Sequence, residues 1–206
     1  MALEIYTLEA SDTPTADFLN TQEQDRFGKI ADPDQRKFFL RTRVFVRQSL
    51  SAFSGIPFTD IRLLTTEVGK PYFENNLSIH FSLTHSGENA WLAVSNKQVG
   101  LDSEKISVRS SFLKIAERFF LPSEIKLVRD SNEQFEVFLK IWTIKEALVK
   151  AAGTGMFANM NDIETGLDEK GFQKILKLPS DWTTLERWEV RSWKTDLHLM
   201  SLALLN

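Results

Sequence analysis

The sequence of 206 residues contains no cysteine, which excludes disulfide bonds, thiolate metal sites and a cysteine nucleophile. It has no excess of basic residues either, since its formal net charge is −3 at pH 7, and nucleic-acid binding is therefore not expected. No run of about 18 apolar residues is present to span a membrane, and Met1–Ala10 lacks the basic and apolar regions of a signal peptide. We therefore expect a cytoplasmic protein that binds neither nucleic acid nor a membrane.

What the sequence does contain is ordinary for a globular protein, with 42% hydrophobic and 26% charged residues. Its patterns predict helix followed by strands, twice along the chain; the first of the helical segments is Thr13–Ile30. This order favours an α+β fold of two lobes, each a small antiparallel sheet packed on a long helix. We expect an N-terminal lobe at residues 1–100 and a C-terminal lobe at residues 101–206.

An acidic strand end is the first candidate site. The segment VGLDSEKI (Val99–Ile106) predicts a strand in which Asp102 and Glu104 point to the same face. In the later segment WTIKEALVKAAGTG (Trp142–Gly155), Glu146 and Lys150 are four residues apart and share one face of a helix. If that face packs against the strand end, three carboxylates and one ammonium converge, and such an oxygen cluster suits Mg²⁺.

Each half of this cluster has a simpler explanation. Acidic pairs are common on solvated strand ends, and a Glu–Lys helix face is usually exposed to water. Apolar neighbours favour a site instead, because Leu101 precedes the strand acids and Ile144, Ala147 and Leu148 leave little of the helix exposed. Acids in such surroundings need a partner, since an unpaired buried charge is costly.

A basic helix is the second candidate, over Gln35–Phe53, where Gly55 provides a stop signal. Arginines and lysines are interleaved there with Phe and Val, so the helix is amphipathic. Its basic face is either a solvated surface or a cationic wall for phosphates. The sequence does not fix the helix register, and the arginine that would meet a phosphate remains open among Arg36, Arg43 and Arg47.

Two turn regions complete the candidate residues. Gly69-Lys70-Pro71 predicts a tight turn that presents Lys70 at a defined angle, although such a sequence is most often only a turn. His85 and Ser86 follow an alternating strand and precede Gly87, so a ligand could approach His85 there. Imidazole can hydrogen-bond a phosphate oxygen and, when protonated, neutralise its charge.

Five motifs in this order resemble those of the 4′-phosphopantetheinyl transferases: GKP (Gly69–Pro71), FSLTHS (Phe81–Ser86), GLDSE (Gly100–Glu104), RFFLPSE (Arg118–Glu124) and WTIKEALVKAAGTG. Within the family, the chain is similar to the long, pseudo-dimeric branch typified by the surfactin-type enzyme. The resemblance implies two lobes related by a pseudo-twofold axis, with coenzyme A bound by the first lobe, metal and catalytic carboxylates in the second, and the active site between them.

The resemblance also implies the reaction and its residues. The enzyme would be a holo-[acyl-carrier-protein] synthase type of transferase, moving 4′-phosphopantetheine from coenzyme A to a serine of an apo acyl or peptidyl carrier protein. Mg²⁺ would be held by Asp102, Glu104 and Glu146, and the catalytic residues would be Glu146, Lys150 and Asp102. The residues implied for coenzyme A, as co-substrate, are Lys70, Pro71, His85, Ser86, Arg36, Arg43, Arg47 and Lys150.

Three questions stay open at the level of sequence. Glu146 is a candidate both for metal ligand and for the base that takes the serine proton, and these roles compete because a metal-bound carboxylate is a poor base. A Mg²⁺-dependent phosphohydrolase or nuclease, or a catalytically silent coenzyme A-binding module, is the alternative function. The carrier protein is not identified, and we expect a monomer because two lobes in one chain supply the whole site.

Overall fold

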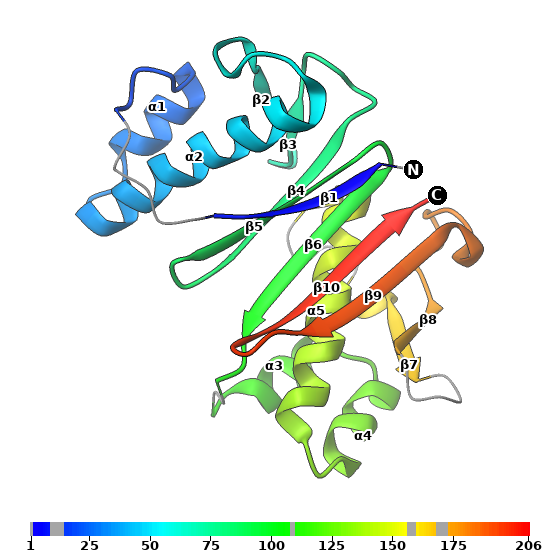
Figure 1. Cartoon of the computed structure of the whole chain (residues 1–206). Helices are drawn as coiled ribbons and strands as arrows, with labels where there is room; N and C mark the ends of the chain where they lie inside the picture. Colours follow the sequence, from blue (N-terminus) through cyan, green and yellow to red (C-terminus); the bar gives the residue numbers. More distant parts are fainter. Residues whose placement is uncertain (1, 9–14, 108–109, 156–159, 168–172) are drawn as a thin grey trace.

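A computed structural model of the chain describes residues 2–8, 15–107, 110–155, 160–167 and 173–206. It has an α+β fold with two three-stranded antiparallel sheets and a long helix for each, as the sequence predicts (Figure 1). Two short two-stranded sheets accompany them. Among the described residues, no helix is both long and apolar enough to cross a membrane.

The first half is built around α2. Its elements are β1 (Leu3–Thr7), α1 (Thr21–Gly28), α2 (Pro33–Ser54), η1 (Phe58–Asp60), β2 (Leu63–Thr65), β3 (Pro71–Phe73), β4 (His80–Ser86) and β5 (Asn89–Ser95). The strand order of the main sheet is β1-β5-β4. Apolar residues of α2 pack against this sheet in a core that includes Phe45, Val46, Phe81, Leu92 and Val94.

The ends of α1 and α2 follow local capping rules. In α2, the Asp32 side chain accepts a hydrogen bond from the Gln35 amide, and Gly55 ends the helix with a φ of 75°. The predicted helix Thr13–Ile30 is wrong in its start, because α1 begins only at Thr21. Asn20 and Glu23 form a capping box there, and this pair satisfies the first amides of the helix.

The second half repeats the connectivity of the first. Its elements are β6 (Gln98–Lys105), α3 (Phe112–Phe119), α4 (Pro122–Asp130), α5 (Gln134–Ala152), η2 (Met160–Asp162), β7 (Glu164–Leu167), β8 (Gln173–Lys177), η3 (Leu185–Arg187), β9 (Trp188–Lys194) and β10 (His198–Leu205). The sheet order β6-β10-β9 matches β1-β5-β4, because in each half the first strand pairs with the last. The repeat begins at β6, so we propose a lobe boundary between Ser95 and Gln98, slightly before the predicted one.

Close packing sets the position of α5 behind β6 and β10 (Figure 1). A Cβ atom on Gly100 of β6 would lie 1.8 Å from the carbonyl oxygen of Ala147, so only glycine permits this approach. Gly100 lies two residues before Asp102, and Ala147 follows Glu146. The same contact therefore brings the acidic strand end and the acidic helix face close together.

A buried ion pair fixes α5 to the neighbouring helices. Lys145 and Glu124 are both fully inaccessible to solvent, and their charged atoms lie 2.6 Å apart. Lys145 also donates to the carbonyl oxygens of Phe119 and Met160, at 3.1 and 3.0 Å. Glu124 accepts from the backbone amides of Leu121 and Thr165, both at 2.8 Å. This single pair thus connects α5, the α3–α4 corner, η2 and β7.

Candidate functional site

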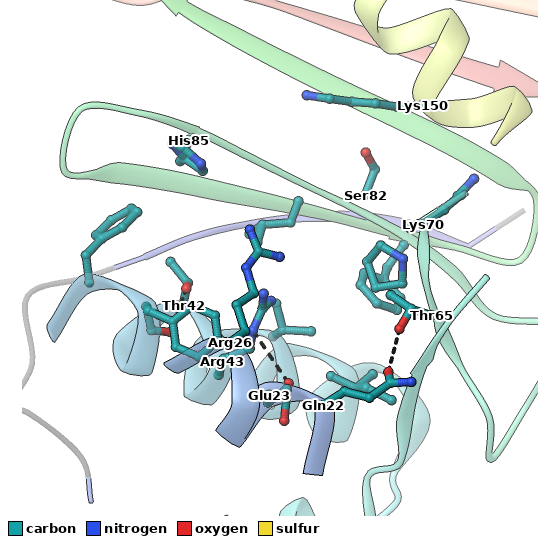
Figure 2. A pocket seen from close by; sticks show the side chains of 18 of the residues that line it. Gln22, Glu23, Arg26, Thr42, Arg43, Thr65, Lys70, Ser82, His85 and Lys150 are labelled. Carbon is teal, nitrogen blue, oxygen red and sulfur yellow. Dashed lines mark hydrogen bonds and ion pairs between the residues drawn. The ribbon is translucent and has the colours of Figure 1, made fainter. Parts of the chain in front are cut away.

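An open cleft with a volume of about 1030 Å³ lies where the two halves meet. Residues of α1, α2, the β2–β3 hairpin and β4 line one side of it, and residues of α5 and Gly153–Gly155 line the other. Figure 2 shows Arg26 and Arg43 extending from α1 and α2 toward the strands, with Lys150 of α5 across the space from them and Lys70 at its edge, beside the β2–β3 hairpin. The cleft is therefore bordered by cationic side chains from several separate elements.

The cationic wall is held in place by an acid. Glu23 accepts a hydrogen bond from Arg47 at 2.6 Å and lies 3.5 Å from Nε of Arg43. Burial lowers the pKa of Arg43, and the neighbouring Arg26 and Arg47 act in the same direction, while Glu23 opposes them. An anion in the cleft would relieve this crowding of positive charge. The cationic side chains that line the cleft on this side are Arg26, Lys37, Arg41 and Arg43.

The three arginines predicted on α2 have different environments. Arg43 lines the cleft. Arg47 is buried, with its guanidinium paired to Glu23, and Arg36 donates to the carbonyl of Ile30 at 2.6 Å while its guanidinium lies over Phe27. Neither Arg36 nor Arg47 is among the described residues that line the cleft. Of the three candidates, the geometry favours Arg43.

Three of the turn residues, Lys70, Pro71 and His85, line the cleft. The Lys70 ammonium donates to the carbonyl of Ala151 at 3.0 Å, at the C-terminal end of α5, and burial lowers the pKa of Lys70 to about 8. Burial also lowers the pKa of His85, helped by the positive charges of Lys150 and Arg26. A phosphate bound nearby would raise the pKa of both side chains, because its negative charge stabilises their protonated forms.

The acidic strand end meets α5 through an ion pair. The Lys150 ammonium lies 2.6 Å from Oδ1 of Asp102 and donates to the Leu101 carbonyl at 3.1 Å. Thr84 of β4 completes the group, because its hydroxyl lies 3.3 Å from the same Asp102 oxygen and 3.4 Å from the ammonium. The predicted meeting of β6 and α5 is thus present, with a hydroxyl between them that the prediction did not include.

Glu146 lies one helical turn before Lys150, is nearly buried and lines the cleft. Burial raises its pKa to about 7, and the negative charges of Asp102 and Glu104 add to the effect, which Lys150 opposes. Oδ2 of Asp102 is buried and has no hydrogen-bond partner. Within the described residues, no three His, Asp or Glu side chains are arranged as a ready metal-binding group.

The raised pKa of Glu146 predicts a specific pH dependence of stability. A carboxyl with a folded-state pKa near 7 and an ordinary value near 4.5 holds its proton more tightly in the folded state. The free energy of unfolding of the metal-free protein should therefore fall as the pH rises between these two values. Urea denaturation in a chelating buffer at pH 5 and pH 8 measures this, and Glu146→Gln should remove that part of the slope. An unchanged slope in Glu146→Gln would contradict the assignment.

Two residues of the site have no prediction from sequence: Arg26, which lines the cleft, and Thr84, which contacts the pair formed by Asp102 and Lys150. Arg26 belongs to α1, which nothing in the sequence places beside α2, and Thr84 was treated only as part of a strand. Alternation gave a usable signal for Thr84, since Ser82, Thr84 and Ser86 share one face of β4. Ser86 itself was predicted to contact the coenzyme, but it is buried and is not among the described residues lining the cleft.

Comparison with known proteins gives a consistent result. Residues 98–203 match the model of the 4′-phosphopantetheinyl transferase superfamily, and residues 11–97 match that of the 4′-phosphopantetheinyl transferase N-terminal domain. The chain is 31% identical to 4′-phosphopantetheinyl transferase Sfp of Bacillus subtilis over 78% of this chain and 77% of the relative. It is 30% identical to 4′-phosphopantetheinyl transferase HetI of Nostoc sp., over 82% and 73% of the two chains.

Among solved structures, the chain is similar to the holo-[acyl-carrier-protein] synthase of Helicobacter pylori, determined in complex with coenzyme A. The match has 20% sequence identity and a TM-score of 0.43, and it covers 52% of this chain and 99% of the other.

Proposed function

The chain belongs to the 4′-phosphopantetheinyl transferase superfamily, and from this membership we propose that it transfers 4′-phosphopantetheine from coenzyme A to a serine of an apo carrier protein. The second product is adenosine 3′,5′-bisphosphate. The observation that carries the proposal is the meeting of Arg43, Lys70, His85 and Lys150 with the carboxylate of Glu146 in one cleft. Coenzyme A has both a pyrophosphate and a 3′-phosphate, so its binding requires several cations in one space.

The cations would act mainly through charge. In the reaction, the serine hydroxyl forms a bond to the β-phosphorus of coenzyme A, and the bond from that phosphorus to the bridging oxygen breaks. Negative charge then grows on the 5′-phosphate of the leaving nucleotide. Lys150 would stabilise this charge as a cation and His85 as a hydrogen-bond donor, because phosphoryl transfer depends on positioning and electrostatics more than on covalent help from the protein.

We propose that Asp102, Glu104 and Glu146 hold Mg²⁺. The unpartnered, buried Oδ2 of Asp102 fits this role, because a cation would satisfy it. Since no three carboxylates of the described residues are arranged as a ready metal-binding group, water and substrate phosphates would complete the shell of the ion. When bound, the ion would neutralise charge on the pyrophosphate.

When its carboxylate is not bound to the ion, Glu146 is also our proposed acceptor of the serine proton, directly or through a water, because a metal-bound carboxylate is a poor base. A pKa of about 7 suits a general base that works near neutral pH. Asp102 is less suited to this role, because its Oδ1 accepts hydrogen bonds from Lys150 and Thr84. Ionised Glu146 would lie beside the cationic Lys150 on one face of α5. From that face, Glu146 would accept the serine proton and Lys150 would stabilise the charge on the phosphate.

We propose that Arg43 of α2 and Arg26 of α1 bind the 3′-phosphate of coenzyme A. We expect Arg43→Gln to raise the Kd of coenzyme A by about 10- to 100-fold, because a hydrogen bond to a charged group contributes roughly 1.5–3 kcal/mol. The Kd of 3′-dephospho-coenzyme A should change much less. Isothermal titration calorimetry with both ligands measures the difference.

Arg129→Gln is the matched control for Arg43→Gln, since it removes the same charge from an exposed ion pair with Glu117. Coenzyme A affinity should not change in this variant. A larger effect from Arg36→Gln than from Arg43→Gln, or equal effects of Arg43→Gln on both ligands, would contradict the assignment.

The release of adenosine 3′,5′-bisphosphate tests the proposed function against its alternatives. The protein is incubated with coenzyme A and Mg²⁺, with and without an apo carrier protein, and the nucleotide is followed by chromatography. A transferase releases it only when the carrier is present. Release without a carrier would support a phosphohydrolase, and no release despite coenzyme A binding to the protein would support a silent binding module.

We further propose that the protein works in the cytoplasm as a monomer, with an acyl or peptidyl carrier protein as its partner. The cleft is lined from both halves of a single chain, so no second copy is required to build it. Which carrier is used, among those of fatty-acid, polyketide and nonribosomal peptide synthesis, depends on contacts outside the cleft.

A further inference from the structure

Three hydroxyl side chains of β4 connect the two main sheets. Ser82 Oγ accepts a hydrogen bond from the Leu101 amide and Ser86 Oγ accepts one from the Lys105 amide, both at 3.0 Å. Thr84, between them, contacts Oδ1 of Asp102 at 3.3 Å. The two serine bonds are four residues apart on both strands, so β4 and β6 run in the same direction. We call Ser82, Thr84 and Ser86 the hydroxyl seam.

Close to the Ser86 backbone lies His198, the first residue of β10. The His198 ring is buried, lies edge-on to Trp91 with ring centroids 4.8 Å apart, and is close enough to the Ser86 backbone for it to oppose the lowering of the His198 pKa by burial. Its Nε2 atom is buried and has no hydrogen-bond partner. His198 pairs with Lys105 in the β10–β6 ladder, so the hydrogen bond between Ser86 and Lys105 lies where β4, β6 and β10 meet.

The hydrogen bond between Ser86 and Lys105 lies next to residues of the proposed site. His85 precedes Ser86 and lines the cleft, while Glu104 precedes Lys105 at the end of β6. This hydrogen bond therefore joins the coenzyme-facing end of β4 to the strand end that carries the proposed metal ligands. Ser86 is buried and is not among the described residues that line the cleft, so its hydroxyl bonds to the protein itself, at the Lys105 amide.

We propose that Ser86 and His198 are positioning residues, which set the separation between His85 and the acidic end of β6 without touching the coenzyme. The proposal rests on the proposed transferase function. Catalysis by charge and orientation is sensitive to small displacements, because a shift of about 1 Å can reduce a rate about 100-fold. Loss of the hydrogen bond between Ser86 and Lys105 should therefore reduce turnover more than it reduces coenzyme binding.

Ser86→Ala tests the proposal against a matched control. This substitution leaves the Lys105 amide without its hydrogen-bond acceptor. The control Ser95→Ala does the same to the Lys97 amide, which donates to Ser95 Oγ over a distance of 3.0 Å, and neither Ser95 nor Lys97 is among the described residues that line the cleft. Both variants should lower Tm by about 2–4 °C. Only Ser86→Ala should lower kcat, by about 10- to 100-fold, with the Kd of coenzyme A unchanged. A raised Kd, or a kcat equal to that of Ser95→Ala, would overturn the proposal.

His198→Phe provides an independent test. It removes the polar edge that His198 turns toward the Ser86 backbone but keeps an aromatic ring against Trp91, and it also removes the unpartnered Nε2 atom. If His198 only packed against Trp91, His198→Phe would reduce neither the stability nor the activity of the protein by much. We expect kcat to fall as in Ser86→Ala and the double variant to be no worse than either single variant. Normal turnover in His198→Phe would overturn the proposal.

Amide hydrogen exchange separates this proposal from the proposed function. In His198→Phe, protection should fall at the adjoining ends of β4 and β6, a change that requires no turnover. Unchanged protection would overturn the positioning role itself. If protection falls as expected but the wild-type protein binds coenzyme A and transfers nothing to a carrier, the transferase function is what fails.

Discussion

Lys145→Met is expected to reduce the free energy of unfolding by about 3–5 kcal/mol, because it leaves a buried carboxylate without its counter-charge. Glu124 is fully inaccessible to solvent and lies 2.6 Å from the Lys145 ammonium. Methionine fills a similar volume but cannot replace that charge or the hydrogen bonds to Phe119 and Met160. Urea denaturation of the variant and the wild type measures the loss.

Lys126→Met is the matched control for this prediction. It makes the same substitution in an ion pair with Asp130 whose side chains are 75% and 63% exposed. Exposed pairs one helical turn apart contribute only about 0.3–0.5 kcal/mol, so the urea midpoint should barely change. Similar losses in the two variants would contradict the role given to the buried pair.

Glu146→Gln is expected to reduce kcat for carrier modification by about 10²- to 10⁴-fold, the usual contribution of a general base. The amide has almost the same shape and keeps an oxygen that can face a metal, but it cannot accept the serine proton. The Kd of coenzyme A should change little, because the cationic lining of the cleft is intact. Single-turnover kinetics and calorimetry measure the two quantities separately.

Glu136→Gln is the control on the same helix, since Glu136 is engaged at the surface with Lys140 and Lys194. Its kcat should match that of the wild type. A Glu146→Gln variant that retains near-normal turnover would exclude Glu146 as the base and leave it as a metal ligand only. An increase in KM for coenzyme A alone would point instead to a binding role.

The local features of the fold were predictable from sequence because they depend on short-range rules. Alternation predicted β4 and β6, and Gly55 and Gly153 end α2 and α5 in the left-handed conformation that glycine favours. Strand and helix periodicity also predicted that Asp102 and Glu104 share one face and that Glu146 and Lys150 share another. That the two faces meet was a hypothesis, which the ion pair between Lys150 and Asp102 supports.

Contacts between distant segments were not predictable in the same way. The helix register left three arginines equivalent, and only the capping box at Asn20 and the position of Glu23 show why Arg47 is buried while Arg43 faces the cleft. The sequence also gave no reason to pair Lys145 with Glu124, which lie on different helices. The family resemblance implies that Ser86 contacts the coenzyme, whereas in the structure its hydroxyl accepts a hydrogen bond from the Lys105 amide.

Intact-mass spectrometry of an apo carrier protein tests the central claim most directly. The carrier is incubated with coenzyme A, Mg²⁺ and either the wild-type protein or Glu146→Ala, and its mass is measured before and after. We predict a gain of one phosphopantetheine group with the wild-type protein, dependent on Mg²⁺ and lost with Glu146→Ala. An unchanged mass for a panel of acyl and peptidyl carriers, under conditions in which the wild-type protein binds coenzyme A, would contradict the assignment of this chain as a transferase.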